Sequence, residues 1–245
     1  MEPIPNASQL LTVWEQGRSQ TPVQRAFSLL ALALPNRAVD ELARYSIGRR
    51  DRELLGLRER LFGSRLAAAA TCPACAQEIE LDFSVADIST TSAPGANEIH
   101  SLQLDGCALN FRLPTCDDLA SLTPGITACE GRSQLLQRCI TEMKTAGPNI
   151  SIAALPEKVA NALSERMAQL DPQGDIQLTL TCPKCRHEWL SPLDIVSYLW
   201  REIHAWAGRT LNEIHLIASA YGWREADILA LSSRRRQTYL KLIES

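Results

Sequence analysis

The spacing of apolar residues predicts helices throughout the first 66 residues of the chain. Apolar side chains recur at intervals of three and four over residues 22–34, and Pro35 follows directly. This interval places them on one face of a helix, and proline rarely continues a helix. Shorter stretches with a helical pattern occupy residues 39–45 and 49–62. The pattern therefore predicts an N-terminal helical segment over residues 1–66.

Several shorter stretches have the pattern of strands. Residues 78–85 alternate between polar and apolar side chains, as in a strand with one buried face. Two apolar runs, 66–70 and 176–180, are also strand-like. Within residues 100–113, Asp105-Gly106 separates two apolar runs, and this dipeptide is a typical hairpin turn. Strands interspersed among long helical stretches predict an α+β fold that is mostly helical.

The middle of the chain is predicted to form an inserted subdomain over residues 98–172, which contains the hairpin and further helices. Residues 89–97 are rich in Ser, Thr, Ala, Pro and Gly and predict a loop at its boundary. Helical periodicity predicts helices over residues 133–144 and 156–170. The pair Asp117-Asp118 is adjacent in sequence, so as helix neighbours the two carboxylates do not face one site. We therefore expect a helix-capping role for this pair, and the block carries no defensible catalytic pairing.

A C-terminal helical segment is predicted over residues 192–245. Ser191-Pro192 has the form of an N-cap followed by proline at the first helical position. A long helix is expected from there to Tyr221. Two shorter helices are expected over residues 227–231 and 234–243.

Two copies of a short cysteine motif lie far apart in the chain. Cys72-Pro73-Ala74-Cys75 and Cys182-Pro183-Lys184-Cys185 are each preceded by Thr and followed, three residues after the second Cys, by Glu. Such a turn presents two sulfurs on one side, and two facing turns make a tetrahedral S4 site that suits Zn²⁺. Because 106 residues lie between Cys75 and Cys182, the fold must bring the two halves together. The motifs therefore predict a split zinc ribbon over residues 67–88 and 175–191, with one structural zinc ion.

Other roles for these cysteines fit the pattern less well. A redox Cys-x-x-Cys normally occurs once, beside a βαβ pattern, and no such pattern is evident. Structural disulfides need an oxidising compartment, and the N-terminus does not resemble a signal peptide. Four thiolates leave no open position for a catalytic water. His187 could replace a Cys ligand, but an ordinary ribbon residue is the expected role.

The remaining cysteines have no Cys-x-x-Cys spacing, and we expect them to be buried free thiols. They are Cys107, Cys116, Cys129 and Cys139.

Composition and charge narrow the function classes. The chain has 245 residues, of which 45% are hydrophobic, and a formal net charge of −3. A dedicated nucleic-acid-binding domain is usually strongly basic, so this balance makes nucleic acid an unlikely partner. No apolar run approaches the ~18 residues needed to span a bilayer, so no membrane association is expected. The paired cysteine motifs and the apparent lack of an export signal favour the cytoplasm.

A zinc ribbon with a helix-turn-helix, as in a transcription factor, is the alternative function. Ala218, Gly222 and Ile228 lie at the relative positions of Ala, Gly and Ile in that motif. The helix after the turn, however, carries Glu225 and Asp227 and few side chains suited to base edges. A zinc-dependent enzyme is a third class, which the sequence favours least.

Three stretches resemble a known family. The first is residues 213–243, in which a long helix is followed by Gly-Trp, an Asp-Ile-Leu-Ala-Leu helix and a basic helix ending in Tyr-Leu-Lys-Leu-Ile. The second is Gly48-Arg-Arg-Asp-Arg-Glu-Leu-Leu, which continues through Leu-Phe-Gly63 into the first cysteine motif, and the third is Phe111-Arg-Leu-Pro-Thr115 followed by Asp-Leu119. The chain resembles baseplate and hub-assembly proteins of contractile phage tails and phage-tail-like injection systems. It departs from their pattern at Arg224, where a small capping residue is expected.

The resemblance implies a non-enzymatic role in assembling or completing a baseplate, as a chaperone-like factor or a minor component that could enter the particle. It implies binding to other baseplate or hub proteins and no small-molecule substrate. We expect the C-terminal segment to form the contact surface, because it combines Trp, Tyr and Leu with Arg, a composition enriched at interfaces. The expected apolar anchors are Trp223, Leu229, Tyr239 and Leu240, and the expected charged rim is Arg234, Arg235 and Arg236.

Overall fold

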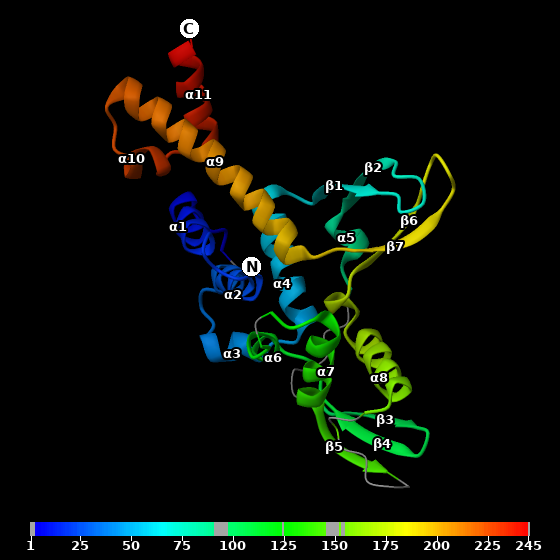
Figure 1. Ribbon diagram of the computed structural model, residues 1–245. Coiled ribbons are helices and arrows are strands. Elements are labelled where there is room, and N and C mark those ends of the chain that lie inside the picture. The colour runs from blue at the N-terminus through cyan, green and yellow to red at the C-terminus, as the bar shows by residue number, and fades with distance from the viewer. Residues whose placement is uncertain (1–2, 91–97, 124, 146–151, 153–154, 245) are drawn as a thin grey trace. The chain divides into compact units, whose positions relative to one another are not determined.

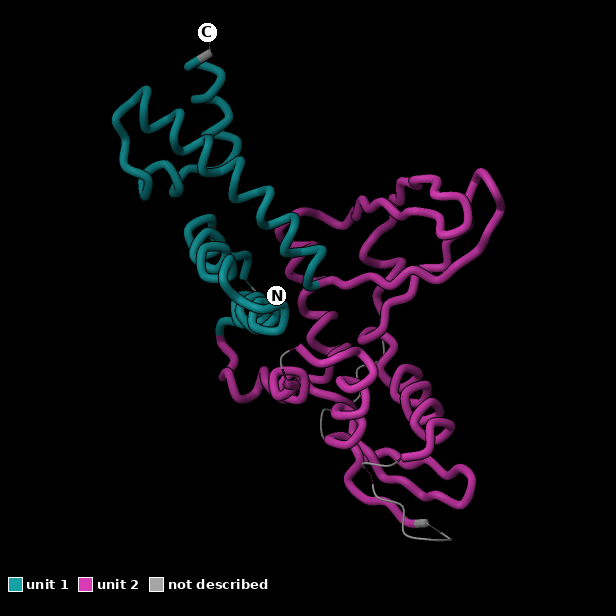
Figure 2. The backbone as a smooth tube through the Cα atoms, in the orientation of Figure 1, with its two compact units in different colours: residues 1–35, 196–245 teal, residues 36–195 magenta. Residues whose placement is uncertain are grey.

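A computed structural model describes residues 3–90, 98–123, 125–145, 152 and 155–244 (Figure 1). Most of the predicted loop at 89–97 therefore lies outside the described residues. The chain forms two compact units, one of residues 1–35 and 196–245 and the other of residues 36–195 (Figure 2). This division differs from the expected segments, because it separates the first 35 residues from the rest of the 1–66 segment. Within the described residues, no helix is both long enough and apolar enough to span a bilayer.

The first unit is helical. Its elements are α1 (Ala7–Gly17), α2 (Pro22–Ala33), all but the first residue of the long helix α9 (Ile195–Tyr221), α10 (Glu225–Leu229) and α11 (Ser233–Glu244). Capping boxes at Asn6 and Thr21 explain where α1 and α2 begin, since each side chain accepts a bond from the third helical N–H. The indole of Trp14 donates to Nδ1 of His204 at 3.0 Å, which joins α1 to α9.

The start of α9 differs from the prediction. Ser191 and Pro192 do not cap the helix; they pair with Leu178 and Gln177 in a β-ladder. The helix begins at Ile195 and runs for 27 residues. Proline is tolerated at the end of an edge strand as well as at a helix start, so the dipeptide alone does not distinguish these positions.

The second unit mixes helices with three small antiparallel sheets, and its fold is α+β. The helices are α3 (Val39–Ala43), α4 (Ile47–Phe62), α5 (Val85–Ile88), α6 (Cys116–Ala120), α7 (Ala128–Cys139), α8 (Glu157–Leu170) and the 3₁₀ turn η2 (Pro172–Gly174). The sheets pair β1 (Arg65–Thr71) with β2 (Glu78–Ser84), β3 (His100–Leu104) with β4 (Cys107–Phe111) and β5 (Ile140–Thr145), and β6 (Gln177–Thr181) with β7 (Glu188–Pro192).

The predicted hairpin at Asp105-Gly106 is confirmed, because β3 and β4 pair across that turn. The predicted helix over residues 133–144 is wrong in its second half. Helix α7 ends at Cys139, and the chain continues directly as β5, which pairs with β4. Glu142, Met143 and Lys144 are good helix formers, but pairing with a distant strand overrides that local preference.

A hydrophobic core of the second unit lies between the three-stranded sheet and helices α7 and α8. Residues from all of these elements are buried together: Cys107, Leu109, Phe111, Leu113, Leu136, Cys139, Ile140, Val159, Leu163 and Met167. The spacing of four between Val159, Leu163 and Met167 predicted this face of α8 correctly.

Candidate metal centre

Each cysteine motif forms the turn of a two-stranded hairpin. Residues 72–77 join β1 to β2, and residues 182–187 join β6 to β7; we call these turns the knuckles. Their backbones match. The N–H of Cys72 donates to the carbonyl of Gln77 at 2.8 Å, and the N–H of Cys182 donates to that of His187 at 2.9 Å.

The residue after the second cysteine has a positive φ in both knuckles, 57° at Ala76 and 62° at Arg186. This conformation is uncommon for residues other than glycine. Its recurrence at equivalent positions shows that the two knuckles are one structural unit used twice.

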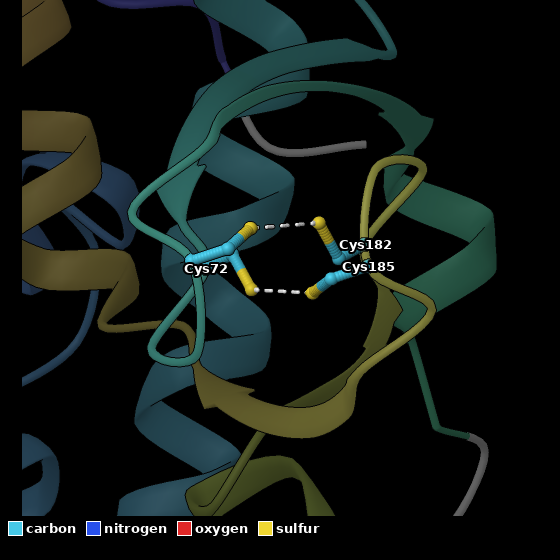
Figure 3. Close-up of side chains that lie close together, drawn as sticks. Cys72, Cys182 and Cys185 are labelled. Atoms are coloured by element: carbon cyan, nitrogen blue, oxygen red, sulfur yellow. Dashed lines mark hydrogen bonds between the residues drawn. The ribbon is translucent and has the colours of Figure 1, made fainter.

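The two knuckles bring their four sulfurs together (Figure 3). The Sγ atoms of Cys72 and Cys185 lie 3.6 Å apart, and so do those of Cys75 and Cys182. All four sulfurs lie within 4.8 Å of one another. A disulfide requires about 2.05 Å, whereas a tetrahedral site with Zn–S bonds of about 2.3 Å places its sulfurs about 3.8 Å apart. The spacing therefore suits a tetrahedral metal ion and not a disulfide.

The electrostatics of the thiols also favour a cation. Backbone N–H groups of Cys185 and Lys184 donate toward the sulfur of Cys182 and lower its pKa to about 6. The pKa of Cys185 is raised to about 12, because desolvation and the hydrogen bonds shared with the neighbouring sulfurs outweigh the N–H of His187. Four thiolates at this distance repel one another unless a cation compensates their charge. The donor set thus fits a thiophilic metal ion.

Burial and neighbours distinguish the four cysteines, as candidate ligands, from His187. Cys72 and Cys182 are buried, whereas Cys75 is half-buried and Cys185 is exposed. His187 is exposed and stacks on Trp189, with ring centroids 6.1 Å apart. Among the described residues, the four cysteines form the group that could hold a metal ion, and His187 is not part of it.

Hydrogen bonds hold together the ends of the two hairpins that lie opposite the knuckles. We call these bonds the hairpin-end contacts. Helix α4 leads into β1, and η2 leads into β6. The Asp171 carboxylate before η2 accepts a bond from the N–H of Gly48 in α4 at 2.8 Å. Gln173 is buried; it accepts from the N–H of Thr90 at 2.7 Å and donates to the carbonyl of Ile88 beyond β2. These bonds join the two hairpins at their other ends, so the sulfur cluster is not their sole connection.

The residues of the hairpin-end contacts were not predicted from the sequence. Gly48 belongs to a motif that was singled out, but nothing local indicates its partner, which lies 123 positions away. Its one signal is a glycine in the first turn of a helix, where alanine would ordinarily be preferred.

The remaining cysteines are mostly as expected. Cys107, Cys116 and Cys139 are buried, and burial raises the pKa of Cys116 to about 11 and of Cys139 to about 12. The thiols of Cys116 and Cys139 are therefore protonated and unreactive at neutral pH. The expectation was wrong for Cys129, which is exposed in the first turn of α7.

The predicted partner residues cluster around the end of α9. The rings of Tyr221, Trp223 and Tyr239 contact one another with centroids 4.9–5.7 Å apart. Trp223 nevertheless keeps 36% of its surface exposed. Its ring thus packs against Tyr221 and Tyr239 and also faces solvent. Leu229 and Leu240 are half-buried.

The three arginines of the expected rim are not equivalent. Arg234 and Arg235 are exposed, but Arg236 is buried. Its guanidinium donates to Glu213 of α9 at 2.9 Å and to the carbonyl of Leu231 at 2.8 Å. Consecutive residues of a helix point in different directions, so one member of the run faces α9 and contributes to folding, not to a charged rim.

A family comparison decides the class of protein. The model of the family described as "T4 bacteriophage base plate protein" matches residues 9–200, more than three quarters of the chain. This chain belongs to that family. Comparisons with curated proteins and with solved structures gave no match. The matched range of this baseplate protein includes both knuckles, and it ends before residues 213–243.

The family membership confirms the resemblance noted in the sequence. Two of the three stretches that carried it, residues 48–63 and 111–119, lie inside the match, whereas residues 213–243 lie outside it. The match does not favour a transcription factor. Helix α10, which would be the recognition helix, has only five residues, and its N-cap Arg224 makes no side-chain capping bond.

Proposed function

We propose that this baseplate protein is a non-enzymatic structural or assembly factor, chaperone-like in action, that binds other baseplate or hub proteins. The family match carries the proposal, because it places the chain among proteins of the phage baseplate. Assembly would begin in the cytoplasm, and the protein could remain in the particle.

We further propose that Cys72, Cys75, Cys182 and Cys185 bind one structural Zn²⁺ and so complete a split zinc ribbon. The sulfur spacing of 3.6 Å supports this ion. With four thiolate ligands the ion has no open position for a substrate or water, so its role is to hold the two hairpins together. The hairpins enclose the inserted subdomain in the sequence, and metal binding would therefore stabilise the fold of residues 36–195.

The proposed partner surface is the C-terminal helical segment. Trp223, Leu229, Tyr239 and Leu240 are the candidate anchors. Arg234 and Arg235 remain candidates for the charged rim, because both are exposed. Arg236 is not part of this surface; its bond to Glu213 holds α11 against α9.

Truncation after Gly222 tests the surface. The shortened protein should remain folded and metal-loaded but fail to support particle assembly, scored by electron microscopy of particles from complemented cells. Normal particles would refute the surface assignment. Arg234→Glu with Arg235→Glu is the point-mutation version, and Arg209→Glu, an exposed arginine of α9, is its matched control.

Titration with duplex DNA at several salt concentrations tests the class of function. If the protein acts in baseplate assembly, we expect no tight binding to duplex DNA. Tight binding whose affinity falls steeply with salt would contradict the proposal, because that slope reports neutralised phosphates.

A further inference from the structure

Strands β2 and β6 of the second unit are edge strands of two-stranded sheets. Among the described residues, β2 pairs with β1 alone and β6 pairs with β7 alone. A strand at the edge of a sheet presents a row of backbone N–H and C=O groups that can pair with another strand. The hairpins are also short two-stranded sheets, which are marginal by themselves.

A groove of about 780 Å³ lies between these strands. Its lining includes every residue from Glu80 to Phe83 of β2 and every residue from Asp175 to Leu180, which spans most of β6. Successive side chains of a strand point to opposite faces of its sheet. Because consecutive residues line the groove, β2 and β6 present their edges to it, not only one face.

The chemistry of the lining is apolar and acidic. Leu81, Phe83, Leu178 and Leu180 supply half-buried apolar side chains, and Ile88 and Ile176 add to them. The carboxylates in the lining are Glu80, Asp82, Asp87 and Asp175. The described lining contains no Lys or Arg; Arg65 of β1 pairs with Asp82 from outside it. A ligand of alternating apolar and basic side chains would complement both features.

We propose that this groove binds an extended segment of another protein, in which apolar residues alternate with Lys or Arg, as an added strand between β2 and β6. Main-chain bonds to a sheet edge provide affinity in such recognition, and alternate side chains provide specificity. A residue in a sheet occupies about 160 Å³, from a rise of about 3.3 Å, a strand spacing of about 4.8 Å and a sheet spacing of about 10 Å. The groove therefore accommodates about five residues.

The site belongs to residues 36–195, whereas the surface in the proposed function belongs to the C-terminal segment. The two can therefore fail separately. Loss of assembly on truncation after Gly222 leaves the groove proposal intact, and a groove that binds no strand leaves the C-terminal surface intact.

A fluorescein-labelled hexapeptide of three Lys-Val repeats is the probe, titrated into the full-length, metal-loaded protein. We expect saturable binding, with slowed hydrogen exchange at the backbone amides of β2 and β6. A Glu-Val peptide of equal length and a Lys-Val peptide with alternate backbone nitrogens methylated should both bind much more weakly. Equal binding of the methylated peptide would overturn strand addition, and equal binding of the acidic peptide would overturn the charge assignment.

Charge reversal in the groove locates the site. Glu80→Lys combined with Asp175→Lys should raise the dissociation constant of the Lys-Val peptide roughly two- to thirtyfold, the range for two exposed ion pairs. Glu78→Lys is the control, because it reverses an exposed charge on β2 outside the groove lining. This variant should leave the dissociation constant of the peptide unchanged. Equal effects of the two variants, or absence of peptide binding by the wild-type protein, would overturn the proposal. So would a dimer in sedimentation that the peptide dissociates, because the occupant would then be a second copy of the chain.

Discussion

At the scale of single residues, the lack of a side chain at Gly48 allows α4 to approach Asp171 closely in the hairpin-end contacts. A Cβ atom at Gly48 would overlap Oδ1 of the buried Asp171 carboxylate, whose other oxygen accepts the Gly48 N–H. Within the described residues, Oδ1 itself has no hydrogen-bond partner. The close approach of helix and carboxylate therefore requires glycine.

Gly48→Ala should destabilise the protein by about 2 kcal/mol, because displacing the carboxylate breaks a buried hydrogen bond. Glycine to alanine in a helix ordinarily stabilises by up to about 1 kcal/mol, so the sign of the change is diagnostic. Gly56→Ala in the same helix is the control, since its Cβ would meet only the end of the Arg60 side chain. Denaturant unfolding measures both variants. A stabilised Gly48→Ala protein would show that Gly48 and Asp171 are not in tight contact.

Asp118 links several elements of the inserted subdomain through ion pairs and hydrogen bonds. Its carboxylate binds Arg112, the residue after β4, Arg138 in α7 and the N–H of Thr115. Burial raises the pKa of this carboxyl, but the bonds from Arg112 and Thr115 outweigh burial and hold it well below its usual range. The capping role expected for the Asp117-Asp118 pair is confirmed at Asp118.

Asp118→Asn should destabilise the protein by about 2 kcal/mol at neutral pH, because it leaves two arginines without their buried partner. A depressed pKa contributes stability above the unfolded value of about 3.9, and this contribution is lost as the pH falls through the folded pKa. The difference in unfolding free energy between wild type and variant should therefore shrink as the pH is lowered below about 4. Asp117→Asn, at the exposed neighbour, should show neither effect. A difference independent of pH would contradict the charge argument.

At the scale of elements, the packing of α11 on α9 depends on a buried ion pair. Arg236 of α11 is 5% exposed and binds Glu213 of α9, and Gln237 donates to the other oxygen of the same carboxylate at 2.7 Å. Ile214, Ile217 and Ile228 are buried in the same segment. The helix that carries the candidate partner residues is therefore held by a charge as well as by apolar contacts.

Arg236→Ala should loosen α11 from α9, at a cost of about 2–3 kcal/mol, because the carboxylate of Glu213 loses its charged partner. Hydrogen exchange should become faster across α10 and α11, while amides of the inserted subdomain keep their protection. Arg235→Ala, one residue earlier and exposed, should leave exchange unchanged. The same exchange pattern in both variants would mean that the ion pair contributes nothing.

At the scale of the whole molecule, the knuckles connect positions far apart in the chain. A metal ion shared between them would close a loop of more than 100 residues. Its binding free energy would become folding free energy, since the unfolded chain holds no preformed site. Each hairpin alone is a marginal structure, so both would gain stability from this connection.

The purified protein should contain one zinc ion per chain by elemental analysis, and chelation should lower its melting temperature. Cys182→Ser should lose most of its metal affinity and melt at a lower temperature throughout residues 36–195, not only in one loop. Cys129→Ser, at an exposed cysteine outside the cluster, should behave as wild type. A folded protein without metal, or an unchanged melting temperature for Cys182→Ser with and without chelator, would contradict the structural role of the site.

The sequence by itself determined the elements whose signals are local. The matched cysteine motifs indicated which four sulfurs belong together, and Asp105-Gly106 and the periodicity of α8 indicated a hairpin and a buried helix face. These signals are readable because turn geometry, capping and amphipathic spacing act within a few residues. Only the tertiary structure decided that residues 140–145 form a strand, that Arg236 is buried against Glu213, and that Gly48 lies on Asp171. Each of these depends on a partner more than 20 positions away, and the free energy of such a contact is absent from the local sequence.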